Sequence, residues 1–226
     1  MESARSKPGG EIRVILAFMI EPFRWRTPGP ATERDLDDLP SGWKGQIAEG
    51  SLFAFPRPAA PHIEAASALT GLLLPPFRFG QGGPGGWVIL AEPEVRFGAN
   101  LLIPDLAGWR RERFASPDQG PYTVRPDWIC ELLSPSTARF DRIKKLRIYA
   151  SSQVPHAWIL DPILTTFEVY RLHNSHWLLS ETHEGNAKVR SEPFEAVEVD
   201  LGLIWTRGGP TTWDFVAEEA AIYGAP

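Results

Sequence analysis

Two carboxylates and a lysine lie in or beside apolar segments of the chain, and their chemical types suit hydrolysis of phosphate esters. Glu131 lies inside the apolar run of residues 128–133, and Asp105 follows the apolar segment 100–104. A buried carboxylate is costly unless it is paired with a cation or coordinates a metal ion. Lys145 lies in the helix-like segment that comes after Glu131. These three residues are therefore the first candidates for a site.

The chemistry that this set could support is metal-assisted hydrolysis. If their segments are neighbouring strands, Asp105 and Glu131 converge to hold one hard cation, since magnesium commonly binds one or two carboxylates together with waters and substrate phosphates. Such a metal lowers the pKa of a bound water and stabilises charge on a phosphoryl oxygen. Lys145 would orient or help to deprotonate the attacking water, or offset charge in the transition state. Asp141 and Tyr149 share its helix stripe at i−4 and i+4 and are expected to support it.

Each of these residues also has a purely structural interpretation. Asp141 and Lys145 could form a solvated ion pair worth roughly 0.3–0.5 kcal/mol. Asp105 could be a turn residue after Pro104, and Glu131 could belong to a structural salt bridge. The catalytic hypothesis depends on the two acids and the lysine occurring in this order.

Histidines and hydroxyls are further candidates. His62 stands at the start of a predicted helix and could bind a metal or a phosphate, or serve as a capping or surface residue. The spacing of the remaining histidines does not form a zinc site. Ser134, Ser136 and Thr137 precede a predicted helix and are expected to cap it, since no histidine is placed to activate a nucleophile.

The elements that must position these residues alternate between helices and strands. We expect helices over residues 32–39, 61–73 and 137–151, single strands over 87–97, 99–109, 127–133, 156–160 and 194–199, a hairpin over 45–58 and another across Asn174. In the second helix, Ile63, Ala66, Leu69 and Leu73 are expected to form the buried face. This order predicts an α/β fold built around one mixed sheet.

Composition limits the class of protein. A chain of 226 residues can build one sizeable core, so we expect an N-terminal extension over residues 1–30 and a single domain over 31–226. The net charge of −5 argues against a protein that coats nucleic acid nonspecifically. The apolar run of residues 14–20 is too short to span a bilayer. One cysteine, Cys130, and no recognisable signal peptide favour a reducing, cytoplasmic compartment.

Several stretches of the chain resemble one family. The segments DLPSGWKGQIAEG, LLIPDLAGWRRER, PDWICELLSPSTARFDRIKKLRIYA and VPHAWILDP are similar to the Uma-type putative restriction endonuclease family of the PD-(D/E)XK nuclease superfamily, over most of residues 36–205. By this resemblance, Asp105 matches the aspartate of the PD motif and Glu131 the acid of the second half-motif. The lysine position two residues later holds Leu133, which is a departure, and the resemblance moves that role to Lys145. Glu49 falls on an auxiliary acidic position.

The resemblance implies a restriction-endonuclease-like core, a mixed central sheet flanked by helices, and cleavage of DNA that depends on Mg²⁺ or Mn²⁺. It makes DNA the expected partner, and we expect a homodimer with no membrane association. Two alternatives remain open. The fold could serve as a binding or regulatory module without catalysis, or as a structural protein that dimerises through an exposed edge strand.

Overall fold

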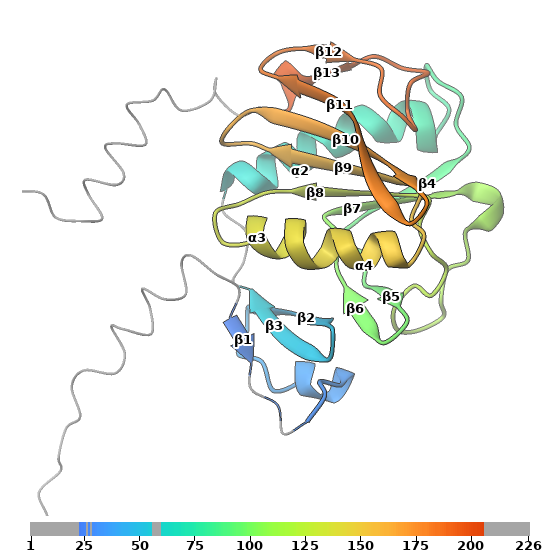
Figure 1. Cartoon of the computed structure of the whole chain (residues 1–226). Coiled ribbons are helices and arrows are strands. Elements are labelled where there is room, and N and C mark those ends of the chain that lie inside the picture. The colour runs from blue at the N-terminus through green and yellow to red at the C-terminus, as the bar shows by residue number, and fades with distance from the viewer. Residues whose placement is uncertain (1–22, 26, 28, 56–59, 206–226) are drawn as a thin grey trace, which may run out of the picture.

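The computed structural model describes residues 23–25, 27, 29–55 and 60–205, which contain two large β-sheets, a two-stranded sheet and several helices (Figure 1). The six-stranded sheet has the order β11 (His176–Glu184), β10 (Thr166–His173), β9 (His156–Asp161), β8 (Trp128–Leu132), β7 (Leu106–Arg110), β4 (Trp87–Ala91). Its β8–β9 pair is parallel and its other pairs are antiparallel. The predicted α/β class with a mixed central sheet is therefore confirmed.

The prediction of one sheet is wrong, because a second, five-stranded sheet is present. Its order is β1 (Phe23–Trp25), β3 (Ser51–Phe55), β2 (Lys44–Ala48), β6 (Asn100–Leu102), β5 (Val95–Phe97). The strands expected over 87–97 and 99–109 each break in the middle. Glu92 has a positive φ of 48° and precedes a proline, and Pro104 has no N–H for a ladder. At these two breaks the chain leaves the six-stranded sheet and returns to it.

Helices cover both faces of β8. On one face, α2 (Ala60–Leu73) packs in the core cluster that contains Trp128, Cys130 and Leu132. On the other face, the cluster around Ile129 includes residues of one continuous helical segment. This segment consists of α3 (Ala138–Phe140), the π-helical turn η4 (Asp141–Lys145) and α4 (Leu146–Ser151), as Figure 1 shows below β8. It confirms the helix predicted over 137–151.

The buried face of α2 differs from the predicted one. The helix buries His62, Ala65, Leu69 and Leu73, while Ile63 is 51% exposed. Both stripes follow helical spacing and share the two leucines, so the apolar pattern alone favoured the isoleucine. The structure instead buries a histidine at the start of the stripe, and this histidine belongs to the site described below.

The remaining elements follow the predictions in part. Both hairpins are confirmed, and the turn residues Glu49 and Asn174 have positive φ values of 51° and 49°. The segment 32–39 forms only a short 3₁₀ helix, η1 (Glu33–Leu36), and η2 (Leu74–Arg78) is a π-helical turn after α2. The prediction of a strand over residues 194–199 is wrong. A short strand, β13 (Val199–Asp200), begins at the last of these residues and pairs with β12 (Lys188–Val189).

The N-terminal extension expected over residues 1–30 falls largely outside the described residues. The segment 23–25 is described, and it pairs with β3 as an edge strand of the five-stranded sheet. Within the described ranges, no helix combines the length and apolar character needed to traverse a bilayer.

Candidate active site

The site lies where the chain re-enters the six-stranded sheet. β7 and β8 are antiparallel neighbours with Leu106 opposite Cys130, so Asp105 lies beside the end of β8. Its Oδ2 accepts a hydrogen bond of 2.7 Å from the backbone N–H of Leu132. Asp105 does not continue a strand with residues 101–103, although one strand had been expected over residues 99–109. The chain leaves β6 at Ile103, where the side chain of Gln46 accepts the backbone N–H at 2.9 Å.

Glu131 is fully buried and receives a donor on each carboxylate oxygen. The Lys145 ammonium donates to Oε2 at 2.8 Å, and the Tyr149 hydroxyl donates to Oε1 at 2.6 Å. Lys145 also donates to the backbone carbonyl of Ile103 at 3.0 Å and lies 3.1 Å from Asp141 Oδ1. The three N–H bonds of the ammonium therefore have three oxygen partners, two of them charged.

The helical segment brings Asp141, Lys145 and Tyr149 to one side because they recur every fourth residue. The solvated ion pair that could have explained Asp141 and Lys145 is excluded, since their side chains are only 3% and 4% exposed. A buried ion pair must recover a desolvation cost that a surface pair does not have. We refer to Glu131, Asp141, Lys145 and Tyr149 as the inner cluster.

His62 joins this region from the opposite helix. Its Nε2 lies 3.2 Å from Oδ1 of Asp105, and the residue is buried, so the surface role considered for it is wrong. The side chains of His62 and Asp105 are 10% and 16% exposed, whereas those of Glu131 and Lys145 are 0% and 4% exposed. Solvent therefore reaches the site on the side of Asp105.

Burial and mutual charge shift the proton affinities of these groups. Burial raises the pKa of Glu131 well above its usual range, and the charges of Asp141 and Asp105 raise it further. Burial also raises the pKa of Asp141. For Lys145, burial acts downward, but the surrounding carboxylates outweigh it and raise its pKa. Burial would likewise raise the pKa of Asp105, yet the hydrogen bond from His62 leaves it lowered.

The donor set fits a hard divalent cation better than a soft one, because it consists of carboxylate and carbonyl oxygens. Three carboxylates, Asp105, Glu131 and Asp141, surround one lysine, and the charges of Asp141 and Asp105 add to the effect of burial in raising the pKa of Glu131. Among the described side chains, no three His, Cys, Asp or Glu residues are grouped so that they could hold a metal ion together. A cation here would rely on one or two carboxylates with water, as is common for magnesium.

Glu49, expected as an auxiliary acid, is not brought into the inner cluster. It lies on the β2–β3 turn and pairs with Lys144 at 2.5 Å and with Arg147, all partly exposed to solvent. Sequence reasoning also missed the Ile103 carbonyl, because any residue type supplies a backbone oxygen. The proline that follows Ile103 was the available signal, since it indicated a break in the strand.

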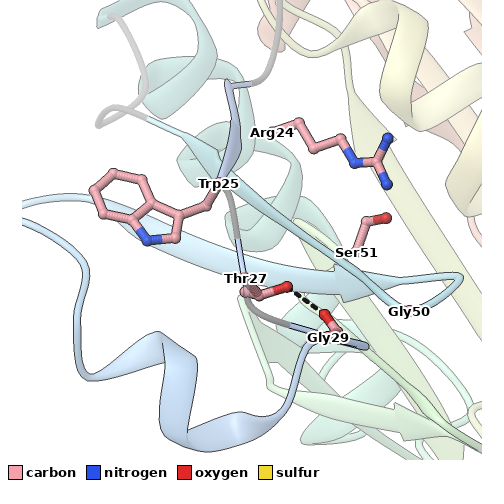
Figure 2. Close-up of a pocket in the computed structure, with 6 residues that line it drawn as sticks. All are labelled: Arg24, Trp25, Thr27, Gly29, Gly50 and Ser51. Atoms are coloured by element: carbon pink, nitrogen blue, oxygen red, sulfur yellow. Dashed lines mark hydrogen bonds between the residues drawn. The ribbon is translucent and has the colours of Figure 1, made fainter.

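A surface pocket is lined by residues outside the inner cluster (Figure 2). It is formed by β1, the segment that follows β1, and the β2–β3 turn. Its lining residues are Arg24, Trp25, Thr27, Gly29, Gly50 and Ser51. Arg24 is the one ionisable side chain among them, and no member of the inner cluster contributes, so the pocket offers no acid for metal-assisted hydrolysis.

Comparisons with known proteins agree with this architecture. Residues 34–202 match the family Uma2, described as "Putative restriction endonuclease". Five solved chains match, among them "a putative nuclease belonging to DUF820" from Anabaena variabilis ATCC 29413, with a TM-score of 0.62 and 21% identity over 77% of this chain and 98% of that chain. At that identity the likeness shows the fold alone. No curated protein matches the chain. Because the family match spans most of its length, the chain belongs to the Uma2 family of putative restriction endonucleases.

Proposed function

We propose that the protein is a magnesium-dependent endonuclease that hydrolyses phosphodiester bonds in DNA. The observation that carries the proposal is the burial of Glu131 between the Lys145 ammonium and the Tyr149 hydroxyl, beside Asp105 on the neighbouring strand. An ion pair built this deeply gives little net stability in return for its desolvation cost. Family membership points to nucleic acid as the substrate that such a site would act on.

Asp105 and Glu131 are the residues that would hold the cation. When bound, magnesium would supply an activated water and stabilise charge on a phosphoryl oxygen. Burial raises the pKa values of Glu131 and Asp141, and a bound divalent cation would favour their ionised forms, because a nearby opposite charge stabilises a carboxylate.

Lys145 acts in this proposal as a fixed positive charge rather than as a base. The surrounding carboxylates raise its pKa, so it keeps its proton at neutral pH and cannot accept one from water. Its contact with the Ile103 carbonyl is the uncharged one of its three, and this is the contact that a phosphoryl oxygen could replace. Asp141 and Tyr149 hold Lys145 and Glu131 in place.

A second candidate function is a nuclease-like module that binds without cleaving. Leu133, at the position where the resemblance expects a lysine, is 3% exposed and belongs to the same core cluster as Ile129. In addition, Lys145 already occupies one oxygen of Glu131. Under this alternative the ammonium would replace the metal permanently, and neither magnesium nor manganese would bind at millimolar concentration.

The test is nicking of supercoiled plasmid in magnesium or manganese. Asp105→Asn and Lys145→Gln are expected to lower the cleavage rate by about 10²-fold or more, the usual effect of removing a group that stabilises transition-state charge. Asp127→Asn and Lys144→Gln are matched controls, since both native residues lie outside the inner cluster and form ion pairs there, Asp127 with Arg113 and Lys144 with Glu49. Equal rates in all five proteins would remove the catalytic assignment. Cytoplasmic location and homodimeric assembly stay predictions.

A further inference from the structure

We propose that His62 is a positioning residue that orients the Asp105 carboxylate for the cation, an inference that rests on the proposed function. The imidazole Nε2 lies 3.2 Å from Oδ1 of Asp105, while Oδ2 accepts the Leu132 N–H at 2.7 Å. The carboxylate is therefore held from α2 on one side and from β8 on the other. An ionised carboxylate offers about four lone-pair sites, so both oxygens can still bind a cation.

The cost of burying His62 supports a role beyond packing. It is the first residue of a buried stripe whose other members are Ala65, Leu69 and Leu73, each fully buried. Its Nδ1 has no hydrogen-bond partner within the described part of the chain. A buried nitrogen without a partner costs free energy that an apolar side chain at the same position would not. The contact between His62 Nε2 and Asp105 is the polar interaction that offsets part of this cost.

The arrangement orients the two metal-binding carboxylates from opposite faces of the sheet. Tyr149, from the helical segment, donates to Glu131, and His62, from α2, contacts Asp105. Polar groups that orient metal ligands typically change metal affinity by about 10- to 100-fold when they are removed. His62 would thus control how well the site holds its cation, whereas Lys145 would act on the phosphate.

Manganese titration by calorimetry tests this role independently of catalysis. The variants are His62→Gln, which keeps an N–H near the Nε2 position, His62→Asn, whose shorter amide does not reach Asp105, and His62→Leu, which keeps the volume. Ser67→Ala, on the exposed side of the same helix, is the matched control. We expect His62→Gln and the control to bind within about threefold of the wild type, and His62→Asn and His62→Leu about tenfold or more weakly.

The outcomes separate this inference from the proposed function. If the wild type binds manganese and nicks plasmid while all His62 variants bind equally well, the positioning role is overturned and the nuclease proposal stands. If the wild type neither binds nor cleaves, both are overturned. A positioning role also predicts that extra manganese restores nicking by His62→Asn, which damage to the fold alone would not allow. The comparison of Gln with Asn remains decisive even if the leucine variant does not fold.

Discussion

Two adjacent lysines of the same helical segment pair with glutamates in opposite environments. Lys144 lies 2.5 Å from Glu49, with the two side chains 33% and 37% exposed. Lys145 lies 2.8 Å from Glu131, with the two side chains 4% and 0% exposed. The outer pair is the shorter one, so distance alone would rank it as the stronger interaction.

Exposure reverses that ranking. Water and salt screen the outer pair, and exposed ion pairs contribute about 0–1 kcal/mol to stability. The inner pair has lost its hydration, and removing one partner leaves a buried charge that costs about 3–5 kcal/mol. A chain gains little net stability from such an arrangement, which is why the inner pair suggests a site and the outer pair does not.

The largest expected effect on stability comes from replacing the inner lysine. Lys145→Met should lower the free energy of unfolding by about 3–5 kcal/mol, because Glu131 and Asp141 lose their common cation. Lys144→Met should change it by less than about 1 kcal/mol. Urea unfolding of both variants at neutral pH measures the difference. Similar losses of unfolding free energy in the two variants would contradict the contrast between the inner and the outer ion pair.

Tyr149 and Tyr170 each donate to a glutamate, and they give a smaller contrast. Tyr149→Phe removes the 2.6 Å hydrogen bond to fully buried Glu131 and should cost about 1–3 kcal/mol. Tyr170→Phe removes a 2.7 Å bond to Glu168, which is partly exposed, and should cost less than about 1 kcal/mol because water can replace the hydroxyl. Thermal unfolding is sufficient for the comparison, and a larger loss in Tyr170→Phe would be evidence against it.

The contributions of Glu168 and Glu131 to stability should depend on pH with opposite signs. The hydrogen bond from Arg142 lowers the pKa of Glu168 below its ordinary 4.5, so its stabilisation is present above 4.5 and is lost as the pH falls through the lowered value. Burial raises the pKa of Glu131, so its contribution weakens as the pH rises from 4.5 through the raised value.

Unfolding measured from acid to neutral pH separates these contributions. Relative to wild type, Glu168→Gln should lose stability only above the lowered pKa of Glu168, by less than about 1 kcal/mol since this group is partly exposed. Glu131→Gln should instead become more stable relative to wild type as the pH rises above 4.5. Glutamine has no proton to lose, so the variant avoids the cost of ionising a buried carboxyl group. Parallel pH profiles for the two variants would refute the assignment of opposite shifts.

Sequence reasoning predicted the elements whose signal is local. The apolar run around Glu131, the helix that carries Lys145 and the hairpin across Asn174 all form as expected. The catalytic hypothesis had assumed that the segments of Asp105 and Glu131 are neighbours, and β7 and β8 do pair in the structure. The second sheet was missed because its strands are short and the chain reaches it through breaks, which alternation of side chains does not reveal.

His62 and Glu49 were placed wrongly from the sequence because their positions depend on tertiary contacts. The helical spacing of α2 permitted two buried stripes, and hydrophobicity selected Ile63 over His62, whose burial depends on a tertiary contact with Asp105. Glu49 was assigned from a motif position, but its turn directs the side chain to Lys144. Burial, which separates the inner pair from the outer pair, depends on tertiary packing and cannot be derived from the spacing of charges.

The most direct test of the account is the rate at which Glu131→Gln nicks supercoiled plasmid in magnesium, compared with Glu168→Gln. Both changes replace a glutamate that accepts hydrogen bonds from a cation and a tyrosine. We expect Glu131→Gln to lose at least about 10²-fold in rate, with Glu168→Gln close to wild type. Wild-type cleavage by folded Glu131→Gln would contradict the claim that the buried glutamate is catalytic.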